Sequence, residues 1–148
     1  ITTPYLICDY SLLEALVLAK RRGVDVKLIT PHIPDKKTML MLTRSNCKPL
    51  LEAGIEVYEY KPGFIHTKMF VCDDEYATVG TVNLDYRSFI HHYECGLWLY
   101  KESSIIDMKV DFLNTAENDG IKMNLKKLRR PWIIRIFKDI LKIFAPLF

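Results

Sequence analysis

A histidine, a lysine and an asparagine lie close together in the middle of this chain, at spacings suited to holding a phosphodiester. Lys68 follows His66 by two residues, and Asn83 closes the same segment. A histidine can attack phosphorus or protonate a departing alkoxide, because its unperturbed pKa lies near neutrality. The lysine ammonium and the asparagine amide can donate hydrogen bonds to phosphoryl oxygens as charge develops on them. Together these side chains predict phosphodiester chemistry that needs no metal.

A β-hairpin is the element that would position these side chains. The run IHTKMFVC is rich in aromatic and β-branched residues and predicts a strand, on which the histidine and the lysine share one face. A second apolar run follows an acidic turn, so the hairpin would return Asn83 to the start of the first strand. Asp73 opens that turn and is counted with the candidate catalytic residues, but its expected role is to organise the turn.

Glu94 is a further candidate for the site. It lies in the run HHYECGLWLY, which predicts another strand. A carboxylate there could accept the Nδ1 hydrogen of His66 and fix the tautomer of the imidazole; the alternative is a strand-edge glutamate that faces solvent. His91 and His92 precede it, and we interpret them as loop or surface groups. No carboxylate cluster or Cys/His pair at metal spacing occurs in the sequence, so neither a metal nor another cofactor is expected.

Length and apolar content predict one α/β domain. The chain has 148 residues, 49% of them hydrophobic, which is enough for one sizeable core and too few for two ordinary domains. A helix is expected after Ser11, a possible N-cap, and a second one from 35 to 53. A short strand follows each helix, and an outer helix is expected from about 102 to 118. This order predicts an α/β/α layered sandwich with a mixed sheet that includes the motif strands.

The four cysteines predict a reducing compartment. Cys8, Cys47, Cys72 and Cys95 are widely spaced, lie in or beside apolar segments and form no CxxC pair. We expect them to be buried thiols of a cytoplasmic protein. The chain begins with an isoleucine and shows no signal-peptide pattern, so we expect it to be part of a longer protein.

Six positions match the signature HxKx4Dx6G[S/T]xN of the phospholipase D superfamily: His66, Lys68, Asp73, Gly80, Thr81 and Asn83. The order of TPY, GVDVKLITP, LLEAGIEVYEY, GFIHTKMFVCDDEYATVGTVNLDYRSF and YECGLWLYK resembles the C-terminal half of bacterial cardiolipin synthases over nearly the whole chain. The resemblance implies a phospholipase D-like fold and transfer of a phosphatidyl group between two phosphatidylglycerol molecules, with release of glycerol, through a phosphohistidine. It also implies that a glutamate such as Glu94 supports the histidine, and that catalysis occurs at the cytoplasmic face of the bacterial cell membrane.

A single copy of the motif is a departure from that family, whose members carry two copies related by a pseudo-twofold axis. No second HxK triplet occurs in the sequence. By resemblance to the second motif, His66 would be the general acid and base, and the other histidine would form the phosphohistidine. We therefore expect an isolated chain to be inactive unless it pairs with a missing N-terminal half or with a second copy of itself.

Positive charge is concentrated at the C-terminus. Residues 121–148 contain eight Lys or Arg and one Asp, a net charge of +7, while the whole chain carries +3. We interpret residues 1–120 as the catalytic half-domain and the remainder as a basic amphipathic tail, whose helix is too short to cross a bilayer. It could bind anionic lipid such as phosphatidylglycerol or cardiolipin at the membrane surface, or dock on protein. The expected membrane contacts are Trp132, Ile133, Arg135, Ile136, Phe137, Lys138, Leu141 and Lys142.

Rival functions share the same motif. A homodimeric nuclease, or a phospholipase acting on another phosphodiester, would use the same histidine chemistry, and a basic tail could bind phosphate backbones. The tail interleaves its basic residues with large aliphatic ones and not with stacking aromatics, so nucleic acid is not an expected partner. A degenerate half that only supports its partner is disfavoured, because every polar position of the motif is present.

Overall fold

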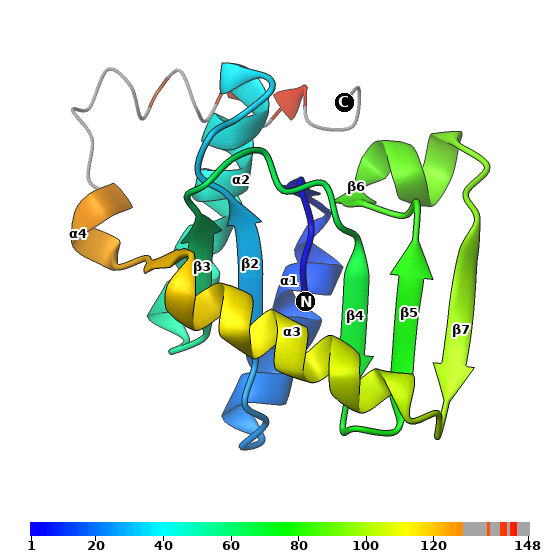
Figure 1. The fold of residues 1–148 in the computed structure, drawn as a ribbon. Coiled ribbons are helices and arrows are strands. Elements are labelled where there is room, and N and C mark those ends of the chain that lie inside the picture. Colours follow the sequence, from blue (N-terminus) through cyan, green and yellow to red (C-terminus); the bar gives the residue numbers. More distant parts are fainter. Residues whose placement is uncertain (129–135, 137–139, 142, 145–148) are drawn as a thin grey trace.

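One mixed β-sheet with helices on both faces organises the chain. The computed structural model describes residues 1–128 and the single residues 136, 140, 141, 143 and 144. Its elements, in chain order, are β1 (Leu6–Ile7), α1 (Tyr10–Arg21), β2 (Lys27–Pro31), α2 (Lys37–Glu52), β3 (Glu56–Tyr60), β4 (Met69–Cys72), β5 (Tyr76–Gly80), β6 (Leu84–Asp85), the π-helix η1 (Arg87–His91), β7 (Gly96–Tyr100), α3 (Ser104–Asn118), β8 (Gly120–Lys122) and α4 (Leu125–Leu128). Figure 1 shows α1 and α2 behind the sheet and α3 across its front.

Two three-stranded groups make up the sheet, and the N-terminal residues join them. In one group β2 pairs in parallel with β3, and β3 pairs antiparallel with β8; in the other, β5 pairs antiparallel with both β4 and β7. Thr2 lies between the groups and bridges Ile29 of β2 in parallel and Met69 of β4 antiparallel. The ends of β2, β3 and β5 and the beginnings of β4 and β7 therefore meet at the same edge of the sheet.

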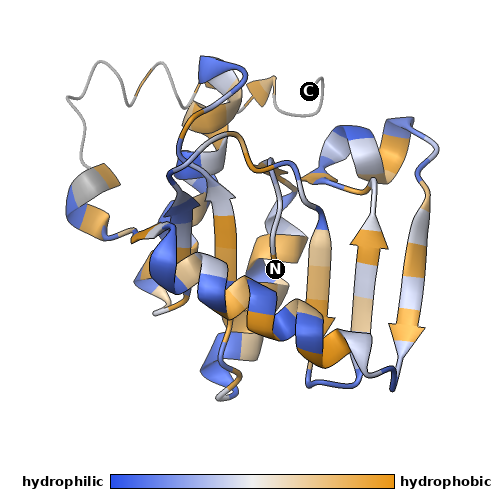
Figure 2. Ribbon diagram, viewed as in Figure 1, coloured by the Kyte–Doolittle hydropathy of each residue, from blue (hydrophilic) through white to orange (hydrophobic). Residues whose placement is uncertain are grey.

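Apolar side chains fill the space on both sides of the sheet. Leu28 and Ile29 are neighbours on β2 and point to opposite faces, because side chains alternate along a strand. Leu28 packs with Leu13 of α1 and Leu50 of α2, whereas Ile29 packs with Phe112 of α3. Strongly hydrophobic residues also alternate with residues of intermediate hydropathy along β5 and β7 (Figure 2). This packing confirms the predicted α/β layers.

The first two helices end as predicted, but the first begins with a different cap. The carboxylate of Asp9, not the hydroxyl of Ser11, accepts a hydrogen bond from Leu12 N at 3.1 Å. Asp9 takes this role because its backbone is extended directly before α1, while Ser11 already lies inside the helix. Gly23 and Gly54 follow α1 and α2 with φ angles of +95° and +83°, which glycine adopts without steric strain.

The predicted hairpin is present, but its first strand is shorter than expected. Asp73 and Asp74 form the turn between β4 and β5 with φ angles of +54° and +61°, as a type I′ turn requires. The strand β4 begins at Met69, so residues 65–68 lie outside it. Thr2 bridges Met69, but the chain that follows it pairs as β1 with β6, so the residues before Met69 lack a strand neighbour on that side among the described residues.

Five short elements carried no recognisable sequence pattern: β1, β6, η1, α4 and β8. The last of these affects the domain boundary, because β8 pairs with β3, and Met123, 5% exposed, donates its N–H to Val57 O at 2.8 Å. The folded unit therefore continues past residue 120, where the tail was expected to begin. Of the expected membrane contacts in the tail, Ile136 and Leu141 are among the described positions, and the other six lie outside the described residues.

The cysteines are all free, as expected, but they differ in burial. Cys8 and Cys47 are buried, and burial raises the pKa of each thiol to about 12. Cys72 is half-buried and Cys95 is exposed. The prediction of four buried thiols was therefore wrong, most clearly for Cys95, which precedes the edge strand β7 and has no further strand beside it in the described sheet.

Candidate active site

The motif residues other than Asp73 gather at the edge of the sheet where β5 ends and β4 and β7 begin. Gly80, the last residue of β5, pairs with Gly96, the first residue of β7. The N–H of Gly80 also donates to Lys68 O, just before β4, at 3.2 Å. The strand register thus brings Lys68, Thr81 and Glu94 to the same end of three neighbouring strands.

His66 presents an exposed imidazole just before β4. Its ring contacts the ring of Phe64, with centroids 5.5 Å apart and planes inclined by 36°. Neither ring nitrogen has a hydrogen-bond partner among the residues that the structure describes, so both are available to a ligand. The structure does not bring Asp73 to this place, because the length of β4 separates the turn from His66.

Lys68 places its ammonium beside the same segment. Its Nζ donates a hydrogen bond to the carbonyl oxygen of His66 at 2.7 Å. Burial lowers the pKa of Lys68, and the charges of Glu94 and Asp85 oppose this shift. A partly desolvated ammonium acts strongly on a nearby phosphoryl oxygen, because charges are screened less in a drier environment.

Glu94 binds Thr81 and not His66. Thr81 Oγ1 accepts a hydrogen bond from Cys95 N at 2.9 Å and donates its own hydrogen to Glu94 Oε2. The bond from Thr81, followed by one from Ser88, lowers the pKa of the Glu94 carboxyl. The expected hydrogen bond from His66 is absent from the described part of the chain, because the pairing of β5 with β7 places Glu94 next to Thr81.

His92 joins the site, although its sequence position indicated a surface loop. Arg87 Nε donates to His92 Nε2 at 2.8 Å, which requires that nitrogen to be unprotonated. The hydrogen of the neutral ring is then on Nδ1, which lies 4.0 Å from Glu94 Oε1. Side chains alternate along an extended segment, so the two-residue spacing between His92 and Glu94 is the signal that could have identified this neighbour.

Asn83 is held in place through its backbone N–H and not through its side chain. Its N–H donates to Ser88 Oγ at 3.1 Å, and Ser88 N donates to Asp85 Oδ1 at 2.7 Å, so the start of η1 holds this residue in place. The Oδ1 atom of Asn83 is buried and has no hydrogen-bond partner among the described residues. Buried polar atoms without partners are uncommon in folded proteins, and a catalytic role is one reason for them.

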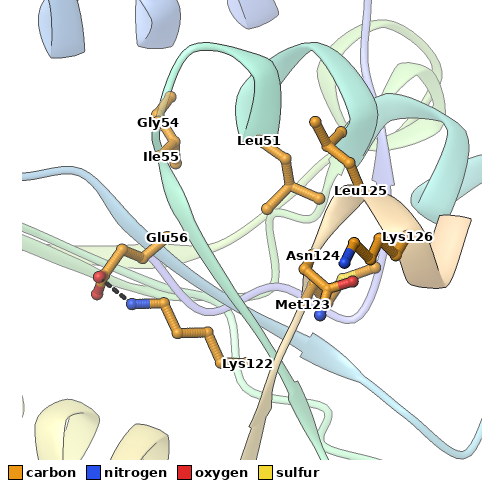
Figure 3. Close-up of a pocket in the computed structure, with 9 residues that line it drawn as sticks. All are labelled: Leu51, Gly54, Ile55, Glu56, Lys122, Met123, Asn124, Leu125 and Lys126. Atoms are coloured by element: carbon orange, nitrogen blue, oxygen red, sulfur yellow. Dashed lines mark hydrogen bonds and ion pairs between the residues drawn. The ribbon is translucent and has the colours of Figure 1, made fainter.

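Two pockets lie at opposite edges of the sheet. The larger, of about 520 Å³, lies at the start of β3 and contains no motif residue (Figure 3). It is lined by Leu51, Gly54, Ile55, Glu56, Lys122, Met123, Asn124, Leu125 and Lys126. The smaller, of about 290 Å³, has Lys68, Gly80 and Phe89 in its wall. Of these two pockets, the smaller one adjoins the candidate active site.

Removing the Thr81 hydroxyl is expected to change how stability depends on pH. The folded-state pKa of Glu94 is depressed, so its contribution to stability is present above the unfolded pKa of about 4.3 and is lost as the pH falls through the lower folded value. Thr81→Val should therefore destabilise the chain more at neutral pH than at about pH 3. Urea unfolding at both pH values measures this difference, with Thr81→Ser, which keeps the hydroxyl, as the matched control. An equal loss at both pH values would contradict the role of this hydroxyl.

Known proteins with a similar sequence share the motif-bearing region. Residues 1–116 match the family model described as cardiolipin synthase, PLD-like domain. The chain belongs to this family. Over 148 residues it is 37% identical to a cardiolipin synthase of Halalkalibacterium halodurans, covering 99% of this chain and 29% of that protein. The phospholipase D-like domain described here therefore spans less than a third of this relative.

Two solved structures share the fold of this phospholipase D-like domain. Phosphatidylserine synthase from Haemophilus influenzae superposes with a TM-score of 0.71 at 18% identity, over 99% of this chain and 38% of that chain. Nuc, a phospholipase D family member from Salmonella typhimurium, superposes with a TM-score of 0.70 at 18% identity, over 83% and 79% of the two chains. At this identity the likeness concerns the fold alone, and it confirms the predicted phospholipase D-like α/β fold class, although not the C-terminal amphipathic helix.

The described part of the domain contains neither a membrane-spanning helix nor a metal-binding cluster. Among the residues placed by the structure, no helix combines the length and the apolar character needed to cross a bilayer. The same residues contain no group of three or more His, Cys, Asp or Glu that could hold a metal ion.

Proposed function

We propose that this phospholipase D-like domain supplies one half of the active site of a phosphatidyltransferase. The enzyme would transfer a phosphatidyl group from one phosphatidylglycerol to another and release glycerol. The gathering of His66, Lys68 and Thr81 at one sheet edge, in a chain of the cardiolipin synthase family, is the observation that carries the proposal. Relatives named cardiolipin synthase match the chain over 99% of its length.

The proposed reaction consists of two displacements at phosphorus. In the first, an imidazole of the partner half attacks the phosphorus of one phosphatidylglycerol, and the bond to glycerol breaks as His66 protonates the departing oxygen. In the second, the neutral His66 takes the proton from a hydroxyl of the second phosphatidylglycerol, whose oxygen attacks phosphorus and releases the imidazole. The proton that His66 gives in the first step is thus recovered in the second.

The other motif side chains would stabilise charge. Lys68 and the amide of Asn83 would donate hydrogen bonds to the phosphoryl oxygens, which carry more negative charge in the transition state. Glu94, held by Thr81, would keep a negative charge at this edge of the sheet. Asp73 would act through the turn that aligns β4 with β5.

A partner is needed for the first displacement, and one face of the sheet could receive it. The strand register places Phe70, Tyr76, Trp98 and Tyr100 on the face of β4, β5 and β7 opposite the Met69 side chain, which packs toward α3. Their exposed fractions are 39%, 38%, 69% and 49%. Exposed aromatic surface of this kind is typical of protein interfaces. In our proposal this face meets the N-terminal half of a longer protein or a second copy of the chain.

Anionic lipid is the proposed substrate, and the membrane surface is the proposed location. The net charge of +7 over residues 121–148 supports this proposal, because each Lys or Arg near an anionic leaflet contributes about 1 kcal/mol of attraction. The tail would bring the domain to the headgroup region from which phosphatidylglycerol is drawn.

An assay on phosphatidylglycerol vesicles tests this function. The longer protein that contains the domain should form cardiolipin and glycerol in equal amounts, whereas dilute isolated chain should form neither. Phosphatidic acid in place of cardiolipin would indicate hydrolysis instead of transfer. Degradation of added DNA without any lipid product would replace the proposal with the nuclease alternative.

A further inference from the structure

A line of aromatic rings leads from the candidate site to the loop after β2. The ring of Phe64 contacts His66 on one side and Tyr5 on the other, and the centroids of Tyr5 and Phe64 are 6.3 Å apart with planes inclined by 45°. The hydroxyl of Tyr5 donates a hydrogen bond to Asp35 Oδ2. The line therefore begins at a loop carboxylate and ends at the proposed catalytic imidazole.

We propose that Tyr5 and Phe64 are positioning residues that set the orientation of the His66 imidazole, and that Asp35 holds Tyr5 in place. This inference rests on the proposed function of His66. A general acid must direct one ring nitrogen at the reacting oxygen, and a carboxylate often directs the ring by binding the other nitrogen. In this domain Glu94 binds Thr81, so the contact with Phe64 is what restricts rotation of His66.

The loop that carries Asp35 is tied to the sheet. Asp35 Oδ1 accepts a hydrogen bond from Lys36 N at 2.6 Å, which orients the carboxylate. At the start of the loop, His32 N donates to Tyr60 O at 3.0 Å. His32 Nδ1 lies 2.8 Å from Glu59 Oε2, and it is the donor because a carboxylate can only accept. Backbone and side chain of His32 thus both hold the loop to β3.

Glu59 gives this attachment a defined geometry. Its carboxylate is on a residue that is 5% exposed, and it accepts hydrogen bonds from Arg44 Nε at 2.6 Å and Arg44 Nη2 at 2.9 Å. A bidentate pair of this kind fixes the orientation of both groups as well as their separation. The position of the loop, and with it the position of Asp35, is therefore set by a partly buried cluster centred on Glu59.

Tyr5 is held at its backbone as well as at its hydroxyl. Thr3 Oγ1 donates to Tyr5 O at 2.7 Å and accepts from Leu84 N at 3.2 Å. Burial, together with the bond to Asp35, raises the pKa of Tyr5, so the hydroxyl stays protonated and remains a donor at neutral pH. A tyrosine held at both ends offers Phe64 a surface that does not move.

NMR spectra of the His66 imidazole in the 148-residue chain test this positioning without any assay of activity. The variant His66→Ala identifies its resonances among those of the four histidines. Phe64→Leu keeps apolar bulk but removes the ring, and it should shift the His66 ring-proton resonances and average the side-chain rotamers. Phe64→Tyr keeps the ring and should preserve the wild-type spectrum. Unchanged His66 resonances in Phe64→Leu would overturn the proposal.

Two milder variants test the hydrogen bond between Tyr5 and Asp35. They also test the orientation of His66 if Phe64→Leu does not fold. Tyr5→Phe and Asp35→Asn weaken or remove the hydrogen bond and leave every ring in place, so they should shift the His66 resonances in the same direction by a smaller amount. Tyr10→Phe is the matched control, because it removes a hydroxyl from a tyrosine that is 75% exposed on α1. Spectra in which all three resemble the wild type would refute the role of Asp35 and Tyr5.

Kinetics of the longer protein separate this inference from the function on which it rests. Phe64→Leu should lower kcat about 3- to 10-fold with little change in KM, because substrate still binds while the acid is misdirected. Full kcat in this variant would overturn the positioning role. Shifted resonances in the variants, together with a wild-type protein that transfers no phosphatidyl group, would leave the positioning intact and refute the proposed function.

Discussion

Replacing His66 with alanine should nearly abolish phosphatidyl transfer while leaving the fold intact. In the longer protein, kcat is expected to fall about 10²- to 10⁴-fold, the usual contribution of a general acid or base, with little change in KM. Stability should hardly change, because the imidazole is exposed and its described contact is with the ring of Phe64. Cardiolipin formation from phosphatidylglycerol vesicles and thermal unfolding of the same samples provide the two measurements.

The same variant distinguishes acid–base catalysis from a binding role. A donor whose leaving group needs no protonation, such as a p-nitrophenyl ester of phosphatidic acid, should load the variant almost as fast as the wild type. Because no His66 then removes the proton from the acceptor hydroxyl, lipid from this donor should accumulate covalently on the partner histidine and be detectable by mass spectrometry. His91→Ala is the control, since it removes another exposed histidine near the site. Full turnover in His66→Ala would exclude His66 from the mechanism.

Gly80→Ala should disrupt the sheet edge that carries the site. A Cβ at this position would lie 2.5 Å from the Cα of Gly96 and closer still to the carbonyl oxygen of Cys95. Both are backbone atoms of the segment that pairs with β5, so neither can move aside without breaking the ladder. We expect a loss of about 3 kcal/mol in the free energy of unfolding, at the upper end for overpacking. Thr81 follows directly and should be displaced, so transfer activity should fall as well.

Gly96→Ala is the matched control for this close approach. It introduces the same methyl group on the opposite strand, where the nearest atom, Val79 O, lies 3.3 Å away. We expect a loss of about 1 kcal/mol or less. Thermal unfolding should separate the two variants clearly, because about 3 kcal/mol corresponds to a shift of roughly 6–12 °C in a domain of this size. Equal shifts would show that the strands do not approach most closely at Gly80.

Local sequence patterns predicted the larger elements well. Apolar spacing marked α1, α2 and α3, and the glycines at 23 and 54 marked two of their ends. The hairpin was predictable because an acidic turn separates two apolar runs, and the aspartates at 73 and 74 adopt the left-handed backbone that such a turn needs. Strands as short as β1 and β6 were not predictable, since two residues cannot show a period.

The sequence-based expectations that differ from the structure have a common physical cause. The strand expected to carry His66 begins at Met69, four residues later than predicted, because pairing depends on which neighbouring strand is present and not on β-propensity alone. Cys95 is exposed although it borders an apolar run, because burial of an edge strand depends on what covers it. β8 extends the folded unit beyond residue 120 because β3 offers it a free edge.

The amino-acid sequence alone determined which side chains this domain can bring together: a histidine, a lysine, a threonine and an asparagine at spacings that a hairpin brings to one end. Only the tertiary structure decided which groups touch. The register of β5 with β7 places Glu94 within hydrogen-bonding distance of Thr81. The path of the loop after β2 places Asp35 within hydrogen-bonding distance of Tyr5, which contacts the ring of Phe64 next to His66. Residue types and spacing are local properties, whereas contact partners depend on strand register and on packing between segments far apart in the chain.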